Sequence, residues 1–259
     1  INITGGTIGQ IFNKVGTVNM SNGTVSTFNN YYDSWNGMYG TTSYAYITGG
    51  TIGTFNNSYV VDMKNANITG AFVMDTRDTA ANPDGTVKLE RINFTRTMHT
   101  SDTNAQHSIY LNTQTPVSVK NSTFNISYTI TNYYTGSSSG IYRMIYKTNN
   151  SALTLDNLTM TGDCYDATTY SRQVTNDTLV GLYNEGSGDI TLTNSSIQNT
   201  SHNNLLLAYG IFNTGSSTID LGVKDGNYLE NSQTIYGASY GIYSTNGLLN
   251  FYDGTIQSN

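Results

Sequence analysis

One spacing of apolar residues recurs along the whole chain: two apolar residues flank a single residue, and a third follows after four more. Apolar residues two apart predict a strand with one buried face, whereas a helix would need them three and four apart. A unit that returns this often predicts a stack of similar coils. The units are Ile1/Ile3/Ile8, Val18/Met20/Val25, Ala45/Ile47/Ile52, Val61/Met63/Ile68, Val87/Leu89/Phe94, Val117/Val119/Phe124, Leu153/Leu155/Met160, Ile190/Leu192/Ile197, Leu221/Val223/Tyr228 and Leu249/Phe251/Ile256.

The four residues inside each unit are patterned too. The second is Gly, Asn or Asp everywhere except at Arg91, and these types best tolerate the left-handed backbone of a tight bend. The expected bends are at Gly5, Asn22, Gly49, Asn65, Asn121, Asn157, Asn194, Asp225 and Asp253. The fourth residue is always Thr, Ser or Asn, which predicts a polar column along the stack. That column would hold Thr7, Thr24, Thr51, Asn67, Asn93, Thr123, Thr159, Ser196, Asn227 and Thr255.

A further strand is expected in the second half, where Gly, an apolar residue and an aromatic residue recur together. The copies are Gly140-Ile141-Tyr142, Gly181-Leu182-Tyr183, Gly210-Ile211-Phe212 and Gly241-Ile242-Tyr243. The sequence therefore predicts an all-β fold, a single-stranded right-handed parallel β-helix (β-solenoid) of about ten rungs with variable connectors. A β-sandwich is the alternative, but it has no reason to keep one spacing throughout.

Both ends of the chain influence the domain prediction. A repeat unit begins at Ile1, and neither end shows the polar capping element that solenoids need. We therefore expect residues 1–259 to form a single β-solenoid domain that belongs to a longer array of repeats.

Composition narrows the possible partners. Charged residues make up 11% of the chain and the net charge is -6, so there is no basic patch with which to bind nucleic acid. The single cysteine, Cys164, excludes an internal disulfide. No apolar run approaches the roughly 18 residues that a membrane-spanning helix needs, so no membrane span is expected.

Several of these stretches resemble a known group of proteins. Tyr240-Gly241-Ile242-Tyr243, Leu249-Asn250-Phe251-Tyr252-Asp253-Gly254-Thr255-Ile256 and Ile47-Thr48-Gly49-Gly50-Thr51-Ile52 are similar to repeats of bacterial cell-surface adhesin-like proteins with right-handed parallel β-helices. The resemblance covers nearly the whole chain and implies an extracellular, cell-surface location. It implies an architecture and a setting but no reaction.

Parallel β-helices also include polysaccharide lyases and hydrolases, which use clustered carboxylates. The best such cluster is Asp75-Thr76-Arg77-Asp78 with Asp84, and we interpret it as a solvated loop. His99, His107 and His202 are far apart in sequence and are interpreted as surface loop residues, and no metal-ligand spacing is present. We expect no enzyme activity, no cofactor and no metal.

The aromatic residues between the units are the candidate ligand-binding groups, because exposed rings and nearby polar groups suit sugar recognition. The candidates are Tyr31, Tyr32, Trp35, Tyr39, Tyr133 and Tyr134. The expected function is a structural and adhesive module that presents Tyr-rich loops to glycans or to host or cell-surface proteins, beside neighbouring solenoid repeats. The alternatives are a carbohydrate-active enzyme and a virus tail protein on the same fold.

Overall fold

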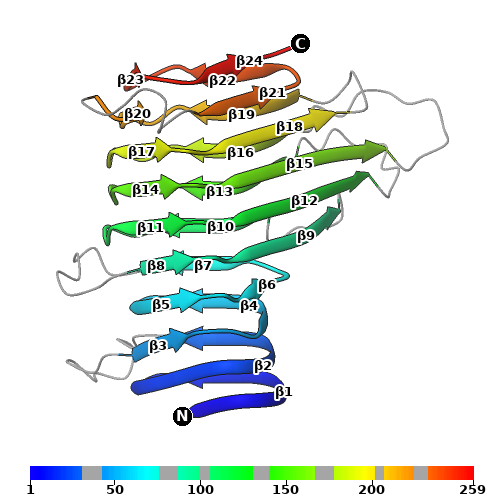
Figure 1. Ribbon diagram of the computed structural model, residues 1–259, viewed down its shortest axis with the longest axis vertical. Coiled ribbons are helices and arrows are strands. Elements are labelled where there is room, and N and C mark those ends of the chain that lie inside the picture. Colours follow the sequence, from blue (N-terminus) through cyan, green and yellow to red (C-terminus); the bar gives the residue numbers. More distant parts are fainter. Residues whose placement is uncertain are drawn as a thin grey trace.

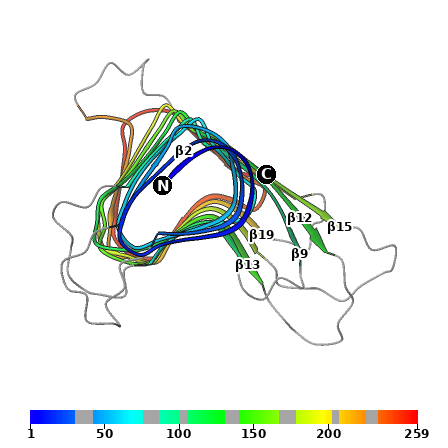
Figure 2. The same cartoon turned by 90° about the horizontal axis from the view of Figure 1, so that it is seen from below.

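The chain forms a parallel β-solenoid whose rungs stack along one axis, with the N- and C-termini at opposite ends (Figure 1). The computed structural model describes residues 1–30, 43–75, 87–99, 106–130, 140–166, 178–201, 207–224 and 233–259. Seen from the N-terminal end, the chain runs clockwise as it recedes, so the coil is right-handed (Figure 2). The predicted all-β solenoid is therefore confirmed.

Each rung contains up to three strand positions, named A, B and C here in chain order. In the first two rungs all positions lie within β1 (Asn2–Asn13) and β2 (Gly16–Asn30). The A strands that follow are β3 (Ser43–Ile47), β5 (Val60–Lys64), β8 (Val87–Glu90), β11 (Val117–Lys120), β14 (Leu153–Asp156), β17 (Ile190–Thr193), β20 (Thr218–Leu221) and β23 (Leu248–Phe251). The B strands are β4 (Thr51–Asn57), β6 (Asn67–Ile68), β9 (Asn93–His99), β12 (Thr123–Ile130), β15 (Thr159–Asp166), β18 (Ser196–Ser201), β21 (Thr234–Gly237) and β24 (Thr255–Gln257). The separate C strands are β7 (Phe72–Asp75), β10 (His107–Asn112), β13 (Ile141–Lys147), β16 (Thr178–Asn184), β19 (Leu207–Asn213) and β22 (Tyr240–Ser244).

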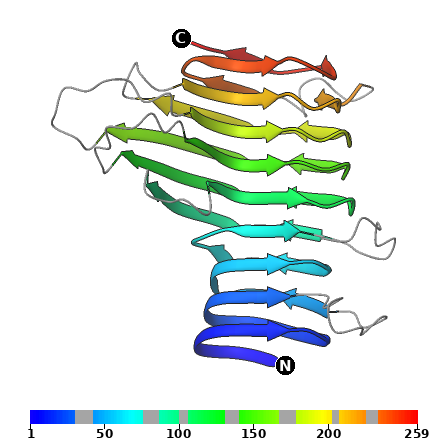
Figure 3. The same ribbon diagram turned by 180° about the vertical axis from the view of Figure 1, so that it is seen from behind.

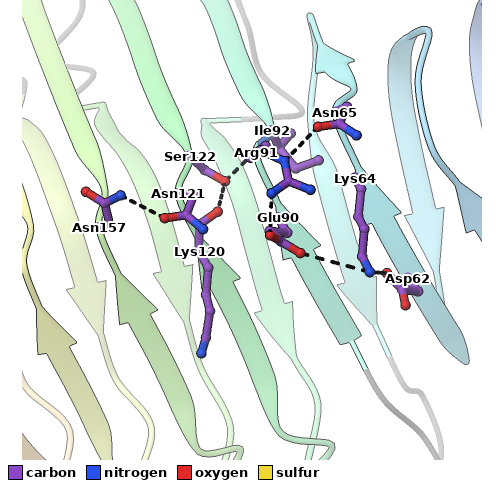
Figure 4. A network of polar contacts seen from close by, with 10 residues as sticks. All are labelled: Asp62, Lys64, Asn65, Glu90, Arg91, Ile92, Lys120, Asn121, Ser122 and Asn157. Carbon is purple, nitrogen blue, oxygen red and sulfur yellow. Dashed lines mark hydrogen bonds and ion pairs between the residues drawn. The ribbon is translucent and has the colours of Figure 1, made fainter.

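The bend between A and B strands has the predicted left-handed backbone. Asn65, Asn121, Asn157 and Asn194 have φ between 51° and 53°, and Arg91, the exception in the sequence pattern, has φ 55°. Their side chains bond between rungs (Figure 4): the Asn157 amide donates to Asn121 Oδ1 at 2.7 Å, and Arg91 Nε donates to Asn65 Oδ1 at 2.7 Å. The bend therefore forms a column of its own.

In four other rungs the prediction placed the bend one residue too early. The positive φ falls on the third of the four residues inside the unit, at Gly6, Gly23, Gly50 and Gly254. Glycine adopts this conformation at no steric cost, so the bend moves to it wherever one is available.

The polar column is confirmed as a line of in-register residues on the outside of the B strands. Thr7 pairs with Thr24, and the line continues rung by rung to Thr255. Within it, Thr123 Oγ1 donates to Asn93 Oδ1 at 2.9 Å, and the Asn93 amide donates to Asn67 Oδ1 at 3.3 Å.

A second column of polar residues, which the sequence analysis missed, is buried at the end of the C position. Amide side chains stack there as an asparagine ladder, because each amide both donates and accepts. Asn13 donates to Asn30 and Asn30 to Asn57, both at 2.7 Å, near the N-terminus. In the other half, Asn184 donates to Asn213 at 2.7 Å. Met74, Leu111 and the buried Lys147 occupy the positions between.

The ninth predicted unit, Leu221/Val223/Tyr228, is wrong. Ile219 and Leu221 are the inward pair of β20, in register with Ile190 and Leu192, and Ile235 is the third apolar residue. Gly222 has φ 94° and turns the chain, which leaves Val223 43% exposed. The polar residue of this rung is accordingly Thr234 and not Asn227, which lies outside the described residues together with Asp225 and Tyr228.

The predicted strand Gly140-Ile141-Tyr142 is also out of register. Tyr183 pairs with Tyr146 and not with Tyr142, so Met144-Ile145-Tyr146 is the equivalent segment. The three later copies of the motif are in register in β16, β19 and β22.

The rungs differ in how the chain passes from the B to the C position. In the first rungs the two positions are continuous, as in β2 and β4. At β9, β12, β15 and β18 the B strands run on past the rod and the chain returns through the C strands, which makes a lateral flange (Figures 2 and 3). The apolar interior of the flange is continuous with the core of the rod, and in it Tyr128 and Tyr142 pack with ring centroids 3.9 Å apart.

Candidate functional site: an aromatic strip

An aromatic strip runs along the outer face of the C strands in the flanged half. It consists of two adjacent columns of residues that pair in register from rung to rung. The first column holds Tyr110, Tyr146, Tyr183, Phe212 and Tyr243. The second holds His107, Arg143, Val180, Tyr209 and Tyr240.

The Gly-apolar-aromatic motif explains how both columns reach the outside. Leu182 is buried in the solenoid core, and a side chain at Gly181 would collide with Ile197 of the neighbouring B strand. Gly210 and Gly241 face Ile235 and Ile256 in the same way. The strand can therefore approach the core closely at the glycine, and the residues on either side of the Gly-apolar pair point outward.

The rings of the first column stack along the rod axis. Tyr183 and Phe212 have centroids 5.0 Å apart and planes 5° apart, and Phe212 and Tyr243 are also 5.0 Å apart. In the second column Tyr209 and Tyr240 stack at 5.1 Å. These separations follow the spacing of about 4.8 Å between paired strands.

The stack is interrupted between Tyr146 and Tyr183, whose planes meet at 74°. The Arg143 guanidinium lies here, with Cζ 4.2 Å from the Tyr146 centroid and 4.7 Å from the Tyr183 centroid. The Tyr146 hydroxyl donates to Glu185 Oε2 at 2.6 Å. The middle of the strip is thus a polar centre between two aromatic segments.

The environment of the strip shifts the pKa of several groups. Burial, followed by the nearby charges of Arg96 and Arg143, lowers the pKa of His107 from 6.5 to about 4, so this imidazole is neutral at pH 7. Burial and then the Glu185 side chain raise the pKa of Tyr146. Both side chains are therefore uncharged at neutral pH.

The accessible part of the strip is the edge of the stack. Tyr183 and Tyr209 are buried, whereas Tyr240 and Tyr243 are 47% and 39% exposed. Because neighbouring rings cover one another's faces, the column presents ring edges and phenol hydroxyls along most of its length. Such a surface suits a long ligand that lies parallel to the axis better than a single sugar ring sandwiched between two aromatic faces.

Lys147 also has a perturbed pKa, but it lies inside the rod. Burial lowers its pKa from 10.5 to about 8, and its Nζ donates to the Asn149 carbonyl at 2.8 Å and to Asn184 Oδ1 at 3.3 Å. It is fully buried in the asparagine ladder, so it has no access to a ligand at the surface.

The six sequence-predicted ligand-binding residues, Tyr31, Tyr32, Trp35, Tyr39, Tyr133 and Tyr134, lie outside the described residues, as do Arg77, Asp78, Asp84 and His202. Asp75 is described, and its carboxylate accepts a hydrogen bond from Asn112 at 3.0 Å. The interpretation of His99 and His107 as loop residues is wrong: His99 ends β9, and His107 lies in β10 with its ring 5.0 Å from that of Tyr110. The recurring aromatic residue of the Gly-apolar-aromatic motif is the sequence signal that could have predicted the strip.

In the described ranges, no three His, Cys, Asp or Glu side chains gather where they could hold a metal ion. Nor does that part of the chain contain a helix of the length and apolar character that crossing a membrane requires. Comparison with protein family models, curated proteins and solved structures finds no match to this chain.

Proposed function

We propose that the protein is a structural and adhesive module of an extracellular surface protein, and that it binds glycan polymers along the aromatic strip. The observation that supports the proposal is the in-register alignment of Tyr110, Tyr146, Tyr183, Phe212 and Tyr243 on one side of a straight rod. Repeated edges and hydroxyls at one spacing complement a linear polymer of similar sugar units. Each contact is weak, and affinity comes from engaging several together.

The construction of the rungs supports the proposed scaffold role. Their backbone groups pair with the rungs above and below, and the buried asparagine ladder adds side-chain bonds in the same direction. Such a rod holds surface residues at fixed positions, so loops and faces can specify contacts while the coil supports them. The connector residues Tyr32 and Trp35 remain a second proposed contact surface.

The test is retention of labelled protein on surfaces coated with polysaccharides. Replacing Tyr240 and Tyr243 together by Ala should lower retention about tenfold, equivalent to about 1.4 kcal/mol, with little change in melting temperature because both rings are substantially exposed. Tyr46→Ala is the matched control, since Tyr46 is 41% exposed on β3, away from the strip.

A combined Tyr32→Ala and Trp35→Ala variant distinguishes the connector from the strip. Loss of retention only in that variant would transfer binding to the connector. Retention that none of these substitutions alters would contradict the proposed contact surfaces, and depolymerisation of the coat would favour the carbohydrate-active enzyme.

A further inference from the structure

Arg143 is a guanidinium without a carboxylate partner among the described residues. Its Nη1 donates to the Ile141 carbonyl at 3.0 Å, while its Nε is buried and has no hydrogen-bond partner there. The ion pairs formed within the described ranges join Lys64 to Asp62 and Glu90, and Arg91 to Glu90. Partly buried charges are normally paired, because removing them from water is costly.

The position of Arg143 makes it available to a ligand of the strip. It is partly exposed in the second column, and the rings of Tyr146 and Tyr183 hold its guanidinium plane in place. A guanidinium fixed in this way is prepared to bind a carboxylate, since little side-chain freedom is lost on binding.

The charges around Arg143 favour an anion locally. Arg96 adds a second positive charge near His107, and Arg96 Nη1 donates to the His107 carbonyl at 2.6 Å. Glu185 is the opposing negative charge, but its carboxylate accepts the Tyr146 hydroxyl instead of pairing with Arg143. In a protein of net charge -6, this cluster is a local exception.

We propose that Arg143 binds the carboxylate of an acidic sugar, so that the strip selects linear polysaccharides containing uronic acid residues over neutral ones. This rests on the proposed glycan binding and adds its ligand class. The acid contacts the guanidinium between the two aromatic segments, and the adjacent sugars lie along Phe212 and Tyr243, which are partly exposed. A linear polymer fits better than the carboxylate of a folded protein, because the strip repeats at one spacing on both sides of Arg143.

The experiment compares polygalacturonate, alginate and hyaluronan with their carboxyl-reduced, neutral forms in binding to the purified chain. The parent should bind at least one acidic polymer about tenfold more tightly than its reduced form. Arg143→Gln should lower binding of the acidic polymer to the level of its reduced form, and Arg143→Lys should keep part of the preference. Lys88→Gln, which removes an exposed cation from β8, should behave like the parent.

The outcomes separate the two proposals. If the parent binds acidic and reduced polymers equally, or if Arg143→Gln keeps the preference, the role of Arg143 is overturned while glycan binding stands. If no polymer of either kind binds, both proposals fail. If Arg143→Gln does not fold, the binding of acidic and reduced polymers to the parent protein still tests whether the strip selects acidic polymers.

Discussion

The slender N-terminal rungs and the flanged rungs that follow share one coil but use it differently. In β2 and β4 the chain passes directly from B to C, and Phe28, Phe55 and Phe72 stack inside the turn at 4.8 and 5.5 Å. From β9 onward the chain leaves the rod at this same point and returns through β10, β13, β16 and β19. The aromatic strip lies on the outside of those returning strands. The coil thus tolerates insertions at one corner, and that corner carries the candidate site.

The largest expected effect tests whether both regions depend on the same core. Ile52 in β4 and Ile197 in β18 occupy the same column and are both fully buried. Replacing either by Asp should destabilise the protein by more than about 4 kcal/mol, because it buries an unpaired charge. Chemical denaturation measures the free energy of unfolding of both variants. If either variant is as stable as the parent, the replaced isoleucine does not face the core.

The second prediction concerns the flange alone, which the slender rungs lack. Gly162 in β15 faces Asn199 and Met144, and a side chain there would collide with both. Gly162→Val should cost about 2–3 kcal/mol through overpacking. Gly9→Val in the slender region is the control, since nothing lies within 4 Å of the position of its Cβ. Equal stability of the two variants would argue against a packed flange.

The third prediction concerns the bend that both regions share. Asn157 has φ 53° and donates to Asn121, so Asn157→Val should cost about 1–2 kcal/mol through backbone strain and the lost bond. Thr154→Val should cost much less, because Thr154 is exposed on β14. Urea denaturation compares the pair, and similar midpoints would contradict the left-handed assignment.

The fourth prediction uses the pH dependence of the flanged region. The pKa of His107 is about 4 in the folded protein, against an ordinary value of 6.5, so the unfolded chain binds more protons between these values. Its contribution to stability is complete above pH 6.5 and is lost as the pH falls toward 4. His107→Gln should flatten this part of the stability profile by about 1–2 kcal/mol, less than the full shift because the ring is partly exposed. An unchanged slope would show that His107 is not desolvated.

The smallest effect concerns the asparagine ladder, at the point where Lys147 replaces an amide. The folded pKa of about 8 lies below the ordinary 10.5, so the buried cation is unfavourable at pH 7 and stability rises between pH 8 and 10.5. Lys147→Met should stabilise the protein by up to about 1 kcal/mol at pH 7 and abolish the rise. Melting curves at pH 7 and pH 10 test this, and a destabilised variant would mean that the Nζ hydrogen bonds outweigh the burial of charge.

The sequence predicted the fold because the A and B strands keep a fixed spacing. Successive inward residues lie two and then five positions apart in the sequence. Because the bend between the strands has a constant length, the A and B strands can be located from this spacing alone. The prediction of the ninth unit failed at the connection between β20 and β21. Leu221 and Val223 have the spacing of an inward pair, although Gly222 turns the chain between them. Local spacing cannot distinguish a core pair from an accidental one, whereas pairing with the rung below can.

The candidate site was much less predictable. Its columns depend on the register between C strands, which connectors of varying length separate, and Tyr142 and Tyr146 are equally plausible from the sequence. The position of Arg143 between two rings follows from the pairing of β13 with β16 and has no counterpart in a linear motif. The buried asparagine ladder was missed for a similar reason, since Asn is abundant and its inward copies do not differ locally from the outward ones.

The direction of the inter-rung hydrogen bonds has a mechanical consequence. The backbone bonds between rungs, and the amide bonds of Asn13, Asn30 and Asn57, run along the rod. A tensile force between the two ends would therefore pull each inter-rung hydrogen bond along its own length, and the rungs would separate one after another. A force across the rod would instead load many bonds of a rung in shear and meet greater resistance. If the rod serves in attachment, its resistance to load depends on the direction in which it is pulled.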